Sequence, residues 1–191
     1  DYLDEPQITI ISPTRDFYES LLPKFRNKLN FHWALEALEE NSYSSKDDIS
    51  DETTQSKTLD DATDDTSAHN QSSIVFLLET DEKQKFLFTG DAGRDAFNHV
   101  PQTLLGKVKD VTWMKVPHHG SKHNLDSTII KHVNPEIAYI STEKQGKYLN
   151  RSTVFALKKN GTKVYSTSQN RSTIRHGAIK TREGWTKIEQ M

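Results

Sequence analysis

The chain has 191 residues, a net charge of −2 and 33% hydrophobic residues, so a large part of it cannot be core. This length suits one ordinary domain or part of a larger one. The lack of cysteine excludes a disulfide framework and a thiolate metal site, and because it suits a reducing compartment we expect a cytoplasmic location. No apolar run approaches the roughly 20 residues needed to cross a bilayer, which excludes a transmembrane segment from this sequence.

Charge is distributed unevenly along the chain. Residues 41–70 carry 2 basic and 8 acidic side chains, whereas residues 107–191 carry 16 basic and 6 acidic ones, a net charge of +10. Such an excess of Lys and Arg is compatible with a polyanionic ligand, because these side chains recruit phosphates. The alternative is an ordinary solvated basic face.

Residues 1–40 are predicted to form a strand followed by a helix. Residues 7–12 (QITIIS) have the β-branched character of a short strand, which Pro13 closes. Thr14 then offers an N-cap for a helix that runs to about Glu40. Pro23 lies inside this helix and should kink or split it.

Residues 41–70 contain 11 Ser or Thr and 8 acidic residues, and almost nothing to bury. This composition predicts a disordered acidic insertion. The alternative is an acidic strand mimic that covers the basic half of the chain.

The remaining residues alternate between short apolar runs and helical patterns. Strands are expected at residues 73–79, 85–89, 111–116, 136–141, 163–166, 172–174 and 185–188, and helices at 94–105, 125–133 and 153–159. Strands that alternate with helices indicate an α/β layer, in which helices cover one face of a sheet.

Polar residues follow two of the predicted strands. Asp91 stands in a glycine-flanked turn after residues 85–89, and His118 and His119 follow residues 111–116. If these strands run parallel, the three side chains share the edge of the sheet where ligands usually sit. Imidazole nitrogen and carboxylate oxygen suit hard-to-borderline metal ions. For each residue alone, the simpler interpretation is a turn or cap aspartate and an ordinary histidine.

Several motifs in chain order resemble the metallo-β-lactamase superfamily, most closely the hydrolase domain of competence DNA-uptake proteins and its free-standing relatives. The resemblance extends over about residues 70–176. Its motifs are N-x-S-S-I-V-F-L-L (70–78), F-L-F-T-G-D (86–91), V-x-W-M-K-V-P-H-H-G-S-K (111–122), P-E-I-A-Y-I-S (135–141) and V-Y-S-T (164–167).

The resemblance implies an αββα sandwich, of which this chain is the C-terminal half, with divalent metal ions held between its two halves. Asp91 would then be the metal-bridging carboxylate and His118 a histidine ligand. His119 would be a further ligand or a group that supports one. We expect two divalent ions, zinc in the first place and manganese as the alternative.

The resemblance also assigns residues around the metals. Ser121 and Lys122 would meet a phosphate or a developing oxyanion, and Gly120 would let the backbone approach a ligand. Asn70, with Ser72 and Ser73 beside it, would support the site and line the place of the substrate. His123 is expected to be a surface histidine.

Two parts of the family pattern are missing. The H-x-H-x-D-H loop that supplies most of the ligands does not occur here, because His32 and His69 do not lie in such a motif. A histidine-proline pair after the strand at 136–141 is also absent. Asn150 or Tyr148 occupies that place, and Asn150 is the residue expected to contact the substrate.

Two explanations fit the missing loop. Either an N-terminal half, on the same polypeptide or on a companion chain, supplies it, or the domain binds without catalysing. We favour the first, because half a sandwich leaves an apolar sheet face in water at about 25 cal/mol per Å². The predicted organisation is a strand and helix at 1–40 that continue the sandwich from an upstream part, the insertion at 41–70, and the C-terminal half of a metallo-hydrolase domain at 71–191.

The predicted function is therefore metal-dependent hydrolysis of a phosphodiester in DNA or RNA, with Asp91, His118, Ser121 and Lys122 as the catalytic residues. One alternative is a hydrolase of small esters, lactones or lactams with the same fold. The other is a catalytically silent binding or regulatory subunit.

Overall fold

The computed structural model describes residues 6–26, 58–142, 148–168, 174–175, 183 and 186–191. Its helices are α1 (Arg15–Arg26), α3 (Ala68–Gln71), α4 (Arg94–Asn98), α5 (Gln102–Leu105), α6 (Ser127–Val133) and α7 (Arg151–Lys159), with 3₁₀ turns η1 (Leu59–Asp61), η2 (Gly106–Val108) and η3 (Pro117–Gly120). The strands are β1 (Gln7–Ser12), β2 (Val75–Glu79), β3 (Lys85–Phe88), β4 (Trp113–Lys115), β5 (Ile137–Ile140), β6 (Lys163–Ser166), β7 (Ile174–Arg175) and β8 (Thr186–Lys187).

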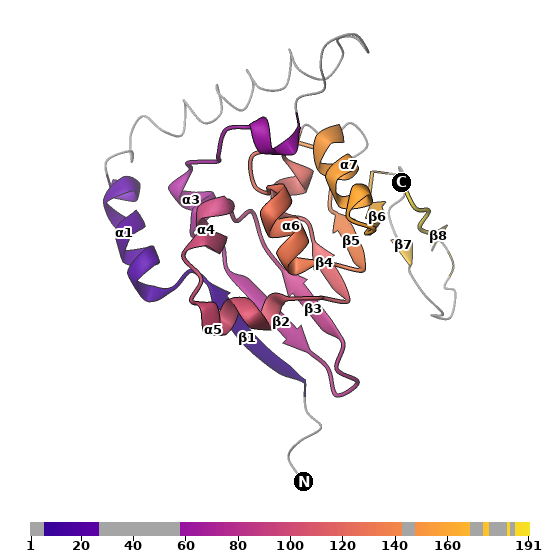
Figure 1. The fold of residues 1–191 in the computed structure, drawn as a ribbon, viewed down its shortest axis with the longest axis horizontal. Helices are drawn as coiled ribbons and strands as arrows, with labels where there is room; N and C mark the ends of the chain where they lie inside the picture. Colours follow the sequence, from indigo (N-terminus) through magenta and orange to yellow (C-terminus); the bar gives the residue numbers. More distant parts are fainter. Residues whose placement is uncertain (1–5, 27–57, 143–147, 169–173, 176–182, 184–185) are drawn as a thin grey trace.

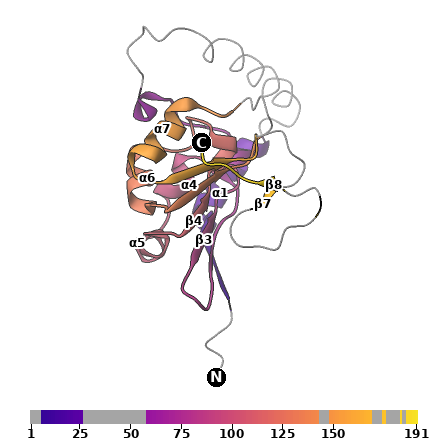
Figure 2. The same ribbon diagram turned by 90° about the vertical axis from the view of Figure 1, so that its right-hand side faces the viewer.

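Six of the strands form one mixed sheet in the order β1-β2-β3-β4-β5-β6 (Figure 1). The first three pair antiparallel, and β3 to β6 pair parallel. Helices α4, α5, α6 and α7 lie on one face of this sheet (Figure 2). The predicted α/β class is therefore confirmed, and β1 places residues of the 1–40 block in the same sheet as the later strands.

The core lies between this sheet and the helices. Inward-facing side chains alternate along the strands, as expected for a sheet with one face covered. Those of Leu77, Leu87, Met114, Ala138 and Val164, one from each of β2 to β6, are at most 1% exposed. They form a continuous apolar layer under the helices.

The other face of the sheet carries a row of aromatic rings, one from each of β2 to β6. Ring centroids lie 4.6 Å apart between Phe76 and Phe88, 5.1 Å between Phe88 and Trp113, and 5.6 Å between Trp113 and Tyr139. Tyr139 stacks on Tyr165 at 5.3 Å. These rings are half-buried, and α4 to α7 all lie on the opposite face. We call this set the aromatic row.

Helix α1 begins at the predicted cap and is not split by its proline. The N–H of Phe17 donates to Thr14 Oγ1 over 3.3 Å, so the predicted cap of α1 is confirmed. The helix then continues through Pro23 without splitting. Phe17 and Leu21, before the proline, and Phe25, after it, all pack against the same core and stabilise the helix on both sides of Pro23. Residues 27–40 of the predicted helix lie outside the described residues.

The helix predicted at 94–105 is divided into α4 and α5. Pro101 stands between them and disfavours helical backbone in the preceding residue, Val100. The division turns the chain between two short helices, each of which still packs a side chain against the core.

The prediction of a disordered insertion over 41–70 is wrong for residues 58–70. They form η1 and α3, with Leu59 and Ala68 buried in the core. These apolar side chains anchor the segment in spite of its polar composition. Residues 41–57 lie outside the described part of the chain.

Candidate functional site

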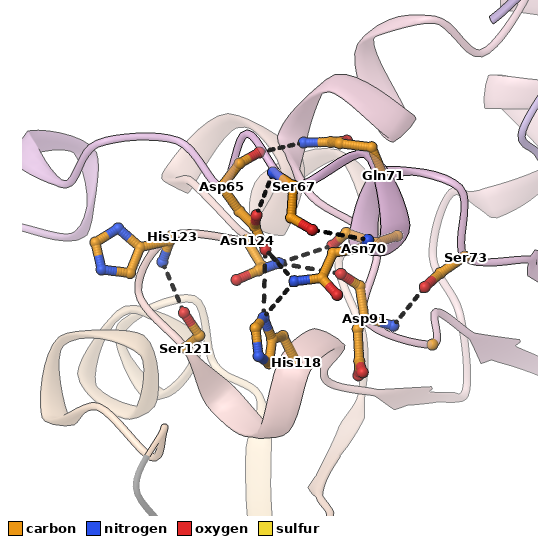
Figure 3. A network of polar contacts seen from close by, with 12 residues as sticks. Asp65, Ser67, Asn70, Gln71, Ser73, Asp91, His118, Ser121, His123 and Asn124 are labelled. Atoms are coloured by element: carbon orange, nitrogen blue, oxygen red, sulfur yellow. Dashed lines mark hydrogen bonds and ion pairs between the residues drawn. The ribbon is translucent and has the colours of Figure 1, made fainter. Parts of the chain in front are cut away.

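The loops after β3 and β4 meet at one edge of the sheet. Because these strands are parallel, Asp91 and His118 lie at the same rim, as predicted. The N–H of His118 donates to the carbonyl of Gly90 over 3.3 Å, which joins the two loops directly. Figure 3 shows both side chains in one view of this rim.

The backbone of the histidine loop is left-handed at three successive residues. The φ angles are 42° at His118, 55° at His119 and 88° at Gly120. For the two histidines this conformation costs about 1–3 kcal/mol each, and such strain tends to gather at functional sites. A Cβ on Gly120 would lie 3.1 Å from Ile140 and 3.3 Å from Leu149. Gly120 therefore leaves room for these two side chains, and its role towards a ligand stays a prediction.

Asp65 is the centre of a polar network that the sequence did not indicate (Figure 3). Its Oδ2 accepts from Asn70 Nδ2 at 2.8 Å and from Asn124 Nδ2 at 3.0 Å, and lies 3.3 Å from Nδ1 of His118. Its Oδ1 accepts from the N–H of Ser67 at 2.9 Å. The Asp65 side chain is only 10% exposed. A largely buried carboxylate thus faces the predicted metal ligand.

Two opposing effects set the charge of Asp65. Burial raises its pKa, but hydrogen bonds with His118, Asn70, Ser67 and Asn124 lower it further than burial raises it. The pKa therefore lies below the usual 3.8, and the group is a carboxylate at neutral pH.

Asn124 ties this network to the loop of Asp91. It is fully buried, and its Nδ2 donates to Asp65 Oδ2 and, over 3.1 Å, to the backbone carbonyl of Asp91. Its Oδ1 has no hydrogen-bond partner within the described part of the chain. One side chain therefore fixes the spacing between the segment of Asp65 and the rim.

Arg94 holds the 58–65 segment in place. Its side chain is 8% exposed and forms an ion pair with Asp64 at 2.7 Å. Its guanidinium also donates, at 3.0 to 3.1 Å, to the backbone carbonyls of Leu59, Ala62, Lys122 and Leu125. Arg94 thus holds the acidic segment, residues 58–65, against the loop after β4.

The carboxylate of Asp91 is more exposed than that of Asp65 and has different neighbours. Its side chain is 39% exposed, and Oδ1 lies 3.3 Å from Nζ of Lys115, which also donates to the carbonyl of Gly90. The N–H of Asp91 donates to Ser73 Oγ at 3.2 Å, so Ser73 supports the turn as predicted. In Figure 3 the carboxylate points away from Asn70 and the Asp65 network.

The histidine rings meet Tyr148 and not Asn150. The ring centroid of Tyr148 lies 4.5 Å from that of His118 and 5.8 Å from that of His119. Nδ1 of His119 donates to the carbonyl of Ser141, which leaves its Nε2 for other partners. Asn150 instead accepts the N–H of Ser152 as the N-cap of α7, so its predicted contact with substrate is replaced by a capping role.

Ser121 is not placed as predicted. It is buried, its Oγ accepts the N–H of His123 at 3.2 Å, and it points away from His118 (Figure 3). Lys122 is half-buried, and its role towards a phosphate stays a prediction. His123 was expected to be a surface histidine, but its Nδ1 donates to the carbonyl of Thr63 at 2.7 Å and helps to hold the acidic segment.

The site contains carboxylate and imidazole groups that could bind a metal ion, but too few of them to form a complete ligand set. Within the described ranges, no three or more His, Asp or Glu side chains come together as a group that could hold a metal ion. The described residues therefore do not by themselves fit a metal centre. Further ligands would have to come from outside them.

Comparisons with known proteins give one partial similarity. No family model matches the chain. Over 108 residues the chain is 30% identical to ComE operon protein 3 of Bacillus subtilis (strain 168), a match that covers 56% of this chain. The match covers 14% of that protein, so the chain corresponds to a small part of its relative.

No helix among the residues that the structure describes is long and apolar enough to span a membrane.

Proposed function

We propose that this chain is the C-terminal half of a metal-dependent hydrolase of the metallo-β-lactamase fold, which cleaves phosphodiesters in DNA or RNA once an N-terminal half supplies the H-x-H-x-D-H loop. The observation that carries the proposal is the meeting of Asp91 and His118 at one rim, with the Asp65 carboxylate behind the imidazole. This arrangement brings a carboxylate-bearing loop and an imidazole-bearing loop to one edge of the sheet.

In this proposal, Asp91 and His118 would hold divalent ions together with ligands of the other half, and His119 would be a further candidate. When bound, such ions lower the pKa of a coordinated water and stabilise charge on a phosphoryl oxygen. This chain contributes the placement of the donors. The loop of His118 is fixed by its hydrogen bond to Gly90, and Asp91 is fixed by its hydrogen bond to Ser73.

The aromatic row supports the need for a second half. Phe76, Phe88, Trp113, Tyr139 and Tyr165 offer a continuous apolar strip on the face opposite the helices. A second sheet packs face to face on such a strip at about 10 Å. Each Å² of apolar surface removed from water contributes about 25 cal/mol, so the packing would hold the two halves together.

The choice of substrate rests on charge and on similarity. The net charge of +10 on residues 107–191 favours a polyanion over an uncharged lactam or lactone. The partial match to ComE operon protein 3 and the resemblance of the motifs to DNA-uptake proteins point in the same direction. Small esters and lactones remain the alternative substrate class.

One observation favours a catalytically silent binding subunit as the second candidate. The ammonium of Lys115 already neutralises Asp91 at 3.3 Å, in the place where a metal would need the carboxylate. A protein in which this ion pair persists would bind its partners without a metal.

The test uses the full-length protein with plasmid DNA and structured RNA in the presence of zinc or manganese. Asp91→Asn and His118→Gln should each abolish cleavage, while the matched controls Asp95→Asn and His99→Gln should cut like the wild type. Full cleavage by either site variant contradicts the proposal. Turnover of a chromogenic ester without cleavage of nucleic acid supports the alternative hydrolase, and absence of metal by elemental analysis of the assembled protein supports the silent subunit.

A further inference from the structure

We propose that Asp65 is a positioning residue, which holds the imidazole of His118 in the tautomer with hydrogen on Nδ1 so that Nε2 faces the rim. The tautomer follows from the geometry of this chain alone. Its consequence for cleavage rests on the proposed function.

Two neighbours compete for Nδ1 of His118. Asp65 Oδ2 and Asn70 Nδ2 both lie 3.3 Å from it, and only the carboxylate is an acceptor. If Nδ1 carried no hydrogen, its lone pair would face the anionic Oδ2, and two acceptors would repel each other. If Nδ1 carries the hydrogen, it donates to a charged acceptor, and such bonds are about twice as strong as neutral ones. The carboxylate therefore decides the tautomer.

The carboxylate is itself held rigidly. Asn70, Asn124 and Ser67 donate to its two oxygens, and the side chain is 10% exposed. Asp65 cannot rotate away from His118 without leaving these donors unpaired, each at a cost of about 1–3 kcal/mol. The geometry is thus built before any ligand binds.

The ring of His118 has little freedom on its other side. Tyr148 lies against it with centroids 4.5 Å apart, and the side chain of His118 is only 15% exposed. With Nδ1 held by Asp65 and the ring face held by Tyr148, the imidazole plane is fixed and Nε2 keeps one direction. A carboxylate that holds the far nitrogen of a ligand histidine is a common support of metal sites.

The experiment reads the tautomer by NMR of the full-length protein labelled with ¹⁵N-histidine, without metal or nucleic acid. The spectra are recorded at alkaline pH, and the ¹⁵N shifts of the two ring nitrogens distinguish the two neutral tautomers. His118 is assigned by loss of its signal in His118→Gln. The wild type should show hydrogen on Nδ1, and Asp65→Asn should shift the population to hydrogen on Nε2, because an amide N–H can face Nδ1.

Two further variants separate the roles of the neighbours. Asn70→Ala should keep hydrogen on Nδ1, since the carboxylate remains. Asp64→Asn removes the ion pair with Arg94 and leaves Asp65 in place, so it should also keep this tautomer even if the protein is less stable. Hydrogen on Nε2 in the wild type, or a switch caused by Asn70→Ala and not by Asp65→Asn, would overturn the proposal.

Cleavage assays then link the tautomer to activity. In the full-length enzyme, Asp65→Asn should lower kcat by about 10–100-fold with little change in KM, while Asp64→Asn keeps kcat. If the tautomer behaves as stated but the wild type cuts no nucleic acid, the positioning role stands and the proposed function fails. If Asp91→Asn is inactive while Asp65→Asn has full activity and an unchanged tautomer, the function stands and the positioning role fails.

Discussion

Nζ of Lys115, the last residue of β4, lies 3.3 Å from Oδ1 of Asp91, which stands in the loop after the parallel neighbour β3. The ammonium competes with any cation for this carboxylate. Two unit charges about 4 Å apart interact by roughly 1–4 kcal/mol at partly exposed sites. Removal of the ammonium in Lys115→Met should therefore tighten binding of Mn²⁺ to the full-length protein by about tenfold.

Calorimetric titration with Mn²⁺ measures this change, and Lys115→Arg is the matched control because it keeps the positive charge. Weaker binding in Lys115→Met would mean that the ammonium orients Asp91 for the metal and does not compete with it. Equal absence of binding in all three proteins would favour the silent subunit.

Arg94 should be the residue on which the order of the acidic segment depends. Arg94→Leu leaves four backbone carbonyls and Asp64 without their donor, and we expect a loss of about 2–4 kcal/mol in the free energy of unfolding. Hydrogen exchange should rise over residues 58–65 before it rises in the sheet. Urea unfolding and hydrogen exchange measure the two effects.

The control for Arg94 is Arg15→Leu. Arg15 also forms an ion pair, with Glu19 at 2.8 Å, but its side chain is 88% exposed. Such surface pairs contribute about 0–1 kcal/mol, so this variant should unfold like the wild type. A loss of similar size in both variants would show that the clamp contributes no more than a surface ion pair.

The rim was predictable from sequence because its signals are local. An apolar strand followed by G-D, and another followed by P-H-H-G, place polar residues at strand ends whatever the rest of the chain does. Parallel pairing of β3 with β4 then brings Asp91 and His118 to one edge. The positions of the strands followed from the same short apolar runs.

Asp65 was not predictable because its contact with His118 spans 53 residues. Its neighbours in sequence are polar and acidic, which locally favours a solvated chain. The decisive partner is Arg94, whose five contacts with the backbone and with Asp64 leave no periodic pattern. The one local signal was Leu59, an apolar side chain in a polar stretch, which is buried in the core.

Tyr139 predicts a loss of stability in alkali. Burial, and then the neighbouring Tyr165, raise the pKa of its phenol from 10.0 to about 12. A pKa that is higher in the folded state means that the neutral phenol stabilises the fold. This contribution is complete below the unfolded pKa and is lost as the pH rises through the folded one. The free energy of unfolding should therefore fall between about pH 10 and about pH 12.

The measurement is urea unfolding across this pH range. Tyr139→Phe should flatten the alkaline decline, whereas Tyr18→Phe, a change at an exposed residue, should keep it. A decline of equal slope in Tyr139→Phe would assign the alkaline loss to other groups.

The lowered pKa of Asp60 predicts that the free energy of unfolding also falls at acid pH. Its carboxylate accepts the hydroxyl of Ser127 at 2.6 Å and the N–H of Ser127 at 2.7 Å, which joins η1 to the first residue of α6. The Ser127 hydroxyl and then its N–H lower the pKa of Asp60, burial opposes them, and the charges of Arg94 and Lys131 lower it further. The stabilisation is therefore complete above the usual 3.8 and is lost as the pH falls through the lower folded pKa.

Asp60→Asn should remove the part of the acid-dependent fall in the free energy of unfolding that comes from Asp60. The fall caused by other groups should remain. Ser127→Ala should weaken the dependence without removing it, because the N–H of residue 127 still donates to the carboxylate. Asp81→Asn, in the exposed turn between β2 and β3, is the matched control and should follow the wild type. The measurement is urea unfolding from neutral pH to about pH 3. If the contact between η1 and α6 holds residues 58–65 in place, the free energy of unfolding should change with pH at a different slope in Asp60→Asn than in Asp81→Asn.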